Sequence, residues 1–225
     1  MANNLSSGKG LFGRKIGMTQ VFDFEGQRIP VTVLEVGPCP VLRVKTEAGP
    51  DGYNALVIGF GKKKVKQINK PDAGLFAKAG VEICAHVGEM RVSAEDVGQV
   101  EVGMMLDASA FRAGQIVDIS GISKGRGFTG VIKRHNMHMP KASHGTHEVF
   151  RHGGSLGMRT TPGRVWLGRK MAGQYGVEKV TIQNLKIHSV EVEKNLIVVK
   201  GSCPGANGSL IWIQEPSKPG KKAAE

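Results

Sequence analysis

A run of fifty residues, 121–170, has too few apolar side chains to build a core of its own. It contains ten Lys or Arg and one acid, Glu148, together with ten of the 32 Gly and five of the seven His. Ordering fifty residues costs more conformational entropy than burial of its fourteen apolar side chains returns. Long basic segments of this kind are normally ordered by an anionic partner. We therefore predict that this basic stretch binds nucleic acid.

The sequence on either side of the basic stretch is close to neutral. Residues 1–120 hold 14 basic and 13 acidic side chains, and residues 171–225 hold seven and five. Most of the formal charge of +12 therefore lies in the stretch, and it raises the pI to about 9.8. Such a balance favours RNA, DNA or an anionic surface as partner. The flanks are together long enough for a sizeable core.

The cysteines and the hydropathy pattern indicate a cytosolic protein. Cys39, Cys84 and Cys203 are odd in number, far apart and without a CxxC pair, so we interpret them as reduced thiols that pack in a core. Residues 1–10 are polar, and no run of 18 apolar residues occurs. We expect neither a signal peptide nor a membrane span.

Short β-branched runs between Gly, Pro and Asn turns predict a mainly β fold. Strands are expected at 11–24, 29–36, 41–46, 53–60, 115–120, 179–184, 186–192, 196–200 and 210–214, and strands or edge segments of a small insertion at 81–92 and 97–106. One helix is expected at 71–79, with Pro71 first and Gly80 after its end. Because no helical crossovers separate the strands, they predict a closed antiparallel β-barrel. Its domain comprises residues 8–120 and 171–216, with a small α+β insertion at about 60–106, a long irregular basic extension at 121–170 and a disordered tail at 217–225.

The segment from Gly125 to Gly130 is a literal GxGxxG that follows a predicted strand, as in dinucleotide-binding folds. Those folds need a helix that opens at the third glycine, and residues 131–140 offer no amphipathic helix of useful length. We therefore favour another role: the glycines let a backbone flanked by Lys124 and Arg126 approach phosphates closely.

Two HxxH pairs, His135 with His138 and His144 with His147, raise the possibility of zinc. No Cys lies nearby, Glu148 is the one carboxylate of the stretch, and local positive charge repels a cation. We predict no metal and no cofactor, and assign the histidines to stacking on bases or hydrogen bonds with phosphate and 2′-hydroxyl groups.

Aromatic side chains are interleaved with the cations, as in stacking sites for single-stranded nucleic acid. We expect Phe128 to pack locally, whereas Trp166 suits packing and stacking equally well. No nucleophile, base and acid occur together in the stretch, so catalysis is not expected.

A second basic run follows residue 61, and its alternatives are a solvated hairpin tip and an RNA-backbone contact. With it, the candidate RNA-binding residues are Lys62, Lys63, Lys64, Lys66, Lys124, Arg126, Lys133, Arg134, His135, His138, Lys141, His144, His147, Arg151, His152, Arg159, Arg164, Trp166, Arg169 and Lys170.

Ordered blocks along nearly the full length resemble the family of the third protein of the large ribosomal subunit, in its bacterial form. The blocks are 13–19 (GRKIGMT), 29–33 (IPVTV), 70–80, 123–128 (SKGRGF), 161–165 (TPGRV), 170–173 (KMAG), 180–185 (VTIQNL) and 195–201 (NLIVVKG). So many blocks in one order make a chance match improbable.

The resemblance implies a translation-factor-like β-barrel and an extension that runs through rRNA toward the peptidyl transferase centre. It further implies binding to 23S rRNA near its 3′ end early in assembly, neighbouring large-subunit proteins as partners, and a place in the cytoplasmic ribosome. Enzymatic activity, a membrane and a small-molecule substrate are not expected.

By the same resemblance, the inward end of the extension is the loop with Ser155, Gly157, Met158, Arg159, Thr160 and Thr161. Some bacterial members carry a methylated Gln in this loop, which here reads GMRTTP at 157–162. That modification is therefore not expected. The alternative function is a free-standing RNA-modifying or DNA-architectural protein that uses the same basic arm.

Overall fold

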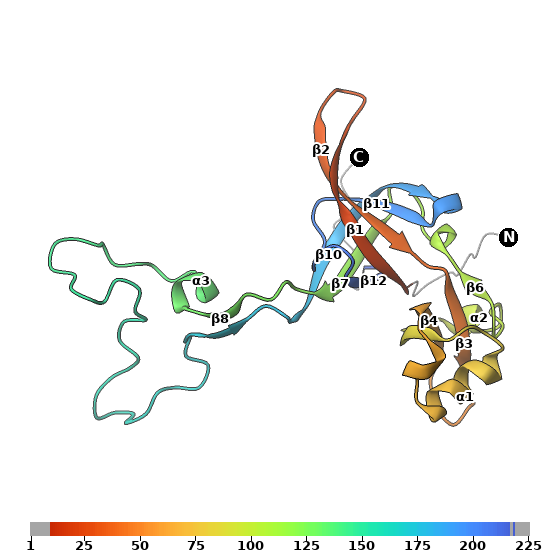
Figure 1. Cartoon of the computed structure of the whole chain (residues 1–225), viewed down its shortest axis with the longest axis horizontal. Coiled ribbons are helices and arrows are strands. Elements are labelled where there is room, and N and C mark those ends of the chain that lie inside the picture. The colour runs from red at the N-terminus through yellow and green to blue at the C-terminus, as the bar shows by residue number, and fades with distance from the viewer. Residues whose placement is uncertain (1–9, 217, 219–225) are drawn as a thin grey trace. The chain divides into compact units, whose positions relative to one another are not determined.

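The computed structural model describes residues 10–216 and 218, and the chain divides into two units (Figure 1). One unit, which we call the arm, is Ser123–Glu178; the rest of the chain forms the main unit. Of the tail predicted to be disordered at 217–225, Lys218 is the one described residue, so that prediction lies outside the described part of the chain.

Six antiparallel strands of the main unit close into a barrel, which confirms the predicted fold class. Their spatial order is β1 (Gly10–Phe22), β12 (Leu210–Gln214), β7 (Ile116–Ile122), β10 (Lys179–Glu191), β11 (Leu196–Lys200) and β2 (Arg28–Val36), with β2 returning to β1.

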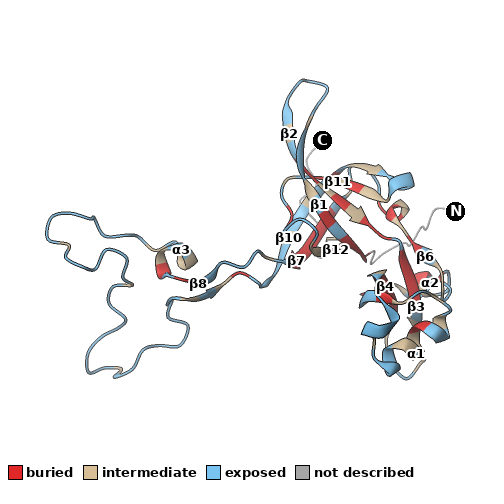
Figure 2. Cartoon of the chain, in the orientation of Figure 1, coloured by how far each residue is buried: buried red, intermediate tan, exposed pale blue. Residues whose placement is uncertain are grey.

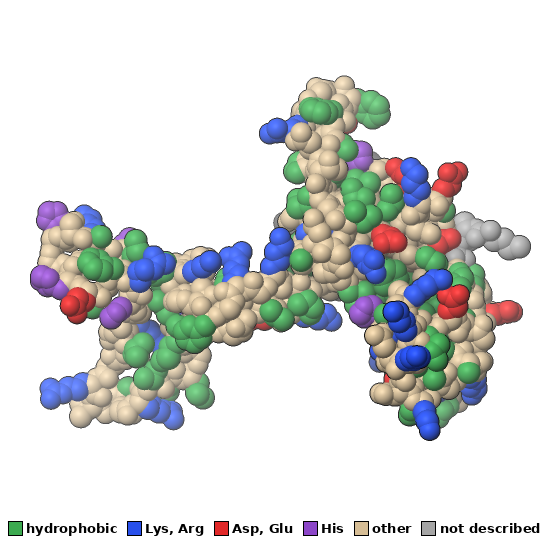
Figure 3. All heavy atoms as spheres, in the orientation of Figure 1, with side chains coloured by type: hydrophobic (Ala, Val, Ile, Leu, Met, Phe, Trp, Pro, Cys, Tyr) green, Lys and Arg blue, Asp and Glu red, His purple; other side chains and the backbone are tan. Residues whose placement is uncertain are grey.

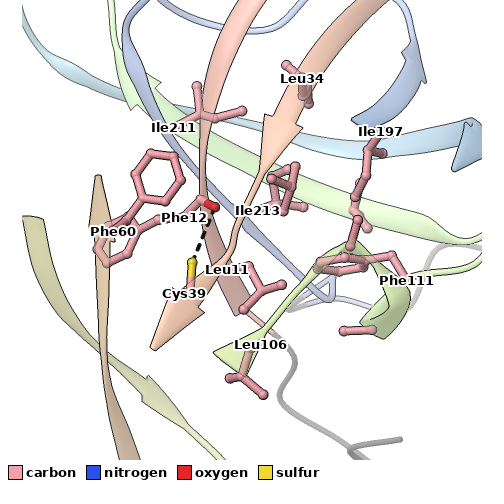
Figure 4. Packing of buried hydrophobic residues seen from close by; sticks show 14 of the residues in the cluster. Leu11, Phe12, Leu34, Cys39, Phe60, Leu106, Phe111, Ile197, Ile211 and Ile213 are labelled. Atoms are coloured by element: carbon pink, nitrogen blue, oxygen red, sulfur yellow. Dashed lines mark hydrogen bonds between the residues drawn. The ribbon is translucent and has the colours of Figure 1, made fainter. Parts of the chain in front are cut away.

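The barrel core follows from the alternation of side chains along its strands. In β11, Ile197 and Val199 are fully buried between partly exposed neighbours, and in β12 Ile211 and Ile213 do the same. Figure 4 shows Ile197, Ile211 and Ile213 gathered with Leu34 of β2 inside the barrel. The branched side chains that favour strands thus also fill the interior.

A second sheet of the main unit has the strand order β5 (Cys84–Arg91), β4 (Ala55–Lys62), β3 (Cys39–Lys45) and β6 (Met105–Leu106). It includes β3, which precedes residue 60, the predicted start of the insertion, and β4, which contains that residue. The first six residues of β4 are buried because both faces of the sheet are covered. Phe60 stacks on Phe12 of the barrel at 6.4 Å between ring centroids, and Phe76 of α1 (Lys70–Ala79) packs with Val57 on the other face.

Helix α1 confirms the predicted helix, with Pro71 in its first turn and Gly80 in the left-handed region at φ 68°. The short helical elements of the main unit are η1 (Val65–Gln67), α2 (Ala94–Val97), η2 (Ala108–Ala110) and η3 (Val192–Lys194). None of the helices in the described residues has the length and apolar character needed to cross a membrane.

The strand predicted at 97–106 is wrong except at its end. Residues 94–97 form α2, and only Met105 and Leu106 form a strand. Ser93 is the N-cap of this helix, and its hydroxyl accepts a hydrogen bond from the Asp96 amide at 3.3 Å. A Ser followed three residues later by an acid is a helix-start pattern. This pattern determines the local structure here, although the valines that follow favour a strand.

The two strands predicted at 179–184 and 186–192 are a single strand, β10. Asn184 has a φ of 58°, and the pairing with β7 shifts register between Ile182 and Leu185. The Asn184 amide donates to the Asp118 carboxylate at 2.9 Å instead of to a carbonyl of the sheet. A bulge of this kind interrupts the alternation without ending the strand.

All three cysteines are free and buried in the main unit, as interpreted from the sequence. Burial raises the pKa of the Cys39 thiol to about 12 and that of Cys203 to about 11. Both thiols therefore stay protonated at neutral pH and serve as packing groups.

Candidate nucleic-acid interface

The arm begins as a narrow two-stranded ribbon. Strand β8 (Gly127–Thr129) pairs with β9 (Gly173–Tyr175), and the Ser123 amide donates to the Glu178 carbonyl at 2.9 Å. This ribbon was not predicted, because three-residue strands leave no detectable alternation in a sequence. Its returning strand lies beyond residue 170, where the basic stretch was taken to end.

A five-residue helix, α3 (Val131–His135), follows the first strand of the ribbon and contacts the returning chain through two of its side chains. The Arg134 guanidinium donates to the Met171 carbonyl at 2.9 Å, and His135 Nε2 lies 3.0 Å from the same oxygen. Val131, the first residue of the helix, is buried. These contacts give Arg134 and His135 a structural role in the arm, which the sequence alone did not suggest.

The local structure of the ribbon explains why two positions of the GxGxxG segment are glycine. A Cβ at Gly125 would lie 2.8 Å from Val177 Cγ2, and Gly127 has a φ of 64° that only glycine adopts easily. Helix α3 does open after Gly130, but it spans only five residues and ends at Asn136 in the left-handed region. This is not the long helix of a dinucleotide-binding unit, which agrees with the sequence-based argument against one.

Beyond α3, residues 136–172 contain no helix or strand and are almost entirely exposed (Figure 2). Of the ten Lys and Arg of the arm, nine are exposed and Arg134 is partly buried. The structure describes every residue of the arm, and none of these cations lies within 4.0 Å of a carboxylate. Figure 3 shows Lys, Arg and His side chains along the arm with hardly any acid between them. The arm therefore presents positive charge that the described chain does not neutralise.

Large apolar side chains of the arm are also exposed. The exposed fractions are 80% for Phe128, 61% for Trp166, 83% for Met158 and 99% for Leu167. The expected local packing of Phe128 is therefore wrong. The guanidinium groups of Arg164 and Arg126 lie 5.2 and 5.3 Å from the ring centres of Trp166 and Tyr175. Planar cationic and aromatic groups so close together suit contact with bases.

The loop at 155–161 is a small turn with few internal contacts. The Ser155 hydroxyl donates to the Gly157 carbonyl at 3.0 Å, and the Arg169 guanidinium donates to the Ser155 carbonyl. Arg159 and Met158 are exposed, as are Thr160 and Thr161. The turn offers a guanidinium and a flexible thioether to whatever it contacts.

The histidines beyond α3, namely His138, His144, His147 and His152, are all exposed. Within residues 10–216 and 218, no group of three or more His, Cys, Asp or Glu is arranged to hold a metal ion.

In the basic run of the main unit, one Lys forms an ion pair and the other three do not. Lys62 Nζ lies 2.8 Å from Glu82 Oε2, and this hydrogen bond raises the pKa of Lys62 and lowers that of Glu82. Lys63, Lys64 and Lys66 are exposed and have no carboxylate within 4.0 Å in the described residues. Three cations of this run are thus available to a ligand, and the fourth shares its charge with Glu82.

Comparison with known proteins identifies the family of this chain. The profile of the family described as "Ribosomal protein L3" matches residues 81–195, which include the whole arm and the strands on either side of it. The chain belongs to the ribosomal protein L3 family. It is 49% identical to "Large ribosomal subunit protein uL3" of Thioalkalivibrio sulfidiphilus over 95% of this chain and 98% of that one. The relatives of the same name from Anaeromyxobacter sp. (strain Fw109-5) and Myxococcus xanthus are 49% and 45% identical, over 93% and 96% of this chain and 91% and 96% of theirs.

Membership of the ribosomal protein L3 family fits the chemistry of the arm. The relatives are named as parts of a ribosomal subunit and not as enzymes, and the arm contains two acids, Glu148 and Glu178, among its ten cations. It thus has the groups of a polyanion-binding surface.

Proposed function

We propose that the arm binds the 23S rRNA of the large ribosomal subunit, of which proteins of this family are structural constituents. Such a protein resides in the cytoplasmic ribosome, with rRNA and other ribosomal proteins as partners. The observation that carries the proposal is the set of ten arm cations with no carboxylate within 4.0 Å among the described residues. Isolated charges of one sign repel one another, and neutralisation by phosphates removes that repulsion while counterions are released.

The exposed apolar groups of the arm support RNA over a simpler polyanion. Phosphates alone satisfy the Lys and Arg side chains, whereas Phe128, Trp166 and Leu167 need an apolar or aromatic surface. Unstacked bases of RNA loops and bulges provide such faces. The candidate contacts are the Lys, Arg, His and Trp residues of the arm named in the sequence analysis, with Lys63, Lys64 and Lys66 of the main unit as a second site.

Arg134 and His135 differ from the other candidate RNA-binding residues, because they also make contacts within the arm. Both already bind the Met171 carbonyl, so their first role is to shape the arm. The remaining N–H groups of Arg134 stay available to a phosphate, since a guanidinium has five of them. We assign the direct phosphate contacts first to the fully exposed cations.

We further propose that binding occurs near the 3′ end of the rRNA early in assembly, and that the loop at 155–161 lies close to the peptidyl transferase centre. The loop has glycines for close backbone approach and the Arg159 fork for phosphate. It has no acid, base or activated nucleophile. Its role is then to position rRNA around the reaction centre, while RNA performs the chemistry.

Replacement of one side chain of this loop tests the positioning role. Arg159→Ala is expected to slow peptide release on purified ribosomes several-fold and to alter sensitivity to drugs bound at the centre, because one phosphate contact worth about 1 to 2 kcal/mol is removed. Lys194→Ala is the control, since Lys194 pairs with Glu191 at 3.3 Å in the main unit. Wild-type rate and drug response in the Arg159 variant would refute the positioning role. Complete loss of activity in normally assembled particles would indicate a direct chemical role instead.

A further inference from the structure

The hairpin of β1 and β2 continues beyond the barrel. β12 pairs with β1 only from Gly10 to Arg14, and β11 pairs with β2 only from Val31 to Glu35. From Met18 to Phe22 the β1 strand pairs with β2 alone, and Arg28 and Ile29 of β2 pair only with β1, while the Pro30 carbonyl also accepts a hydrogen bond from the Gly201 amide at 2.9 Å. Figure 1 shows this hairpin projecting from the barrel of the main unit. Residues 16–30 therefore form a finger, and we use that name below.

The tip of the finger is a tight turn with a fixed shape. The Gly26 amide donates to the Asp23 carbonyl at 2.8 Å, and the Asp23 amide donates to the Gln27 carbonyl at 2.9 Å. Gly26 has a φ of 75°, as a three-residue hairpin loop requires. The Asp23 carboxylate accepts a further hydrogen bond from the Phe24 amide at 2.8 Å. The turn therefore holds Phe24 at the end of the finger.

The finger is apolar where a hairpin in water is normally polar. Phe24 is fully exposed, and the exposed fractions of Phe22 and Met18 are 68% and 52%. Met18 and Phe22 lie four residues apart in one strand and so face the same side. Figure 3 shows apolar side chains gathered at the end of the finger. Exposed aromatic groups on a rigid support are typical of anchors that enter a pocket of a partner.

The charge of the finger separates it from the arm. Residues 16–30 contain two acids, Asp23 and Glu25, one Arg and no Lys, in a chain with a net charge of +12. The two carboxylates directly flank Phe24. A base stacked on Phe24 would bring its phosphates close to both acids, and like charges repel. The charge therefore favours a protein with cations at the contact over RNA.

We propose that the tip of the finger docks into an apolar pocket of a second protein of the large subunit, bordered by Lys or Arg side chains. Phe24 enters the pocket, and Asp23 and Glu25 face the cations at its rim. The pocket contacts need no rearrangement of the finger, because the turn is already formed. Pro30 has no N–H to donate, so the β2 edge is unsuited to binding by strand addition. This inference rests on the proposed function, since it places the partner in the same subunit.

A photoreactive phenylalanine analogue tests the docking. The probe is p-benzoylphenylalanine at position 24 of the full-length chain, which serves as the sole copy in assembled large subunits. The same probe at Val65 is the control, because Val65 is 73% exposed but lies between Lys64 and Lys66. Irradiation is expected to link position 24 to one protein peptide that contains apolar residues and Lys or Arg, identified by mass spectrometry. Links from position 24 to rRNA, or none above background, would overturn the proposal.

Neutral isosteres test the charge at the rim. The double variant Asp23→Asn with Glu25→Gln keeps an acceptor for the Phe24 amide and for the Gln27 side chain, which bonds to Glu25 at 3.1 Å. Loss of two rim charges is expected to lower the yield of the protein crosslink about fivefold. The melting of the barrel stays unchanged, because the tip is exposed. An undiminished yield contradicts the charge complementarity on which the choice of partner rests.

Sedimentation separates this proposal from the function on which it rests. If the full-length chain fails to sediment with the large subunit, the proposed function and the finger proposal both fail. If the chain sediments normally and position 24 links only to rRNA or to nothing, the finger proposal alone fails.

Discussion

The main unit buries or pairs several of its cations, whereas the arm leaves nine of its ten exposed. Lys15 is buried in the main unit, and its Nζ donates to the carbonyls of Cys203 and Gly205 at 2.7 and 3.2 Å. Lys45 binds Glu89 at 2.5 Å. No Lys or Arg of the fully described arm has a carboxylate within 4.0 Å. The main unit thus pairs some of its cations within the chain, with the exposed Lys63, Lys64 and Lys66 as exceptions, whereas the arm has no cation–carboxylate pair in the described residues.

Apolar side chains repeat this contrast. Ile197 and Leu34 of the barrel are fully buried, whereas Leu167 and Phe128 of the arm are almost fully exposed. The hydrophobic effect stabilises the first pair within the chain and can stabilise the second pair only within a complex. We infer that the main unit folds by itself and that much of the arm is ordered by rRNA.

Removal of the arm should have the largest effect on binding and a small one on folding. Ser123 and residues 177–178 are hydrogen-bonded neighbours, so an Asn-Gly turn in place of residues 124–176 should close the chain. We expect the cooperative melt of the β domain to persist, because the main core cluster lies wholly outside the arm. Affinity for rRNA fragments should fall about 1000-fold or more with the loss of ten cations. Circular dichroism and filter binding measure the two effects. Loss of the cooperative melt would show that the main unit does not fold without the arm.

Matched substitutions of one apolar side chain in each unit test the difference between the units further. Ile197→Ala in the barrel should lower the free energy of unfolding by about 2 to 4 kcal/mol, since a fully buried side chain is removed. Leu167→Ala in the arm should leave that quantity within about 0.5 kcal/mol, yet weaken rRNA binding several-fold. Chemical denaturation and binding titrations on both variants test the pair. Equal destabilisation by the two changes would show that the arm has a core of its own.

The smallest expected effect is on the salt dependence of binding. Lys141→Ala removes an exposed arm cation, and the slope of log affinity against log salt should become shallower by about 0.7 to 0.9 for one lost phosphate contact. Lys62→Ala is the control, because Lys62 already binds Glu82, and its slope should change less. Identical slopes for Lys141→Ala and wild type would remove Lys141 from the footprint, and a larger change in the control would shift the footprint to the main unit.

The sequence predicted those parts of the fold whose pattern is local. The predicted strands at 196–200 and 210–214 coincide with β11 and β12, because alternation and flanking turns both lie within a few residues. Helix α1 was equally well marked by Pro71 and Gly80. The absence of a core in the basic stretch also followed from composition alone.

Features that depend on distant partners could not be predicted in this way. The role of Arg134 is set by the Met171 carbonyl, which is distant in sequence, and the bulge at Asn184 is set by Asp118 of another strand. The acidic tip of the finger was not predicted, because in sequence its residues indicate only a turn. Their exposure, and the projection of the hairpin beyond the barrel, become visible only in three dimensions.

The contact of Arg134 and His135 with the Met171 carbonyl has a consequence for polymer statistics. It turns the chain between α3 and β9 from an open segment into a closed loop, whose two sides begin and end at one point. Loop closure lowers the entropy of that chain before any ligand arrives. Once one side of the loop meets the rRNA, the other side is present at a high effective concentration and binds as an intramolecular step. The two sides of the loop should therefore associate with the rRNA cooperatively, although they make no regular structure with each other.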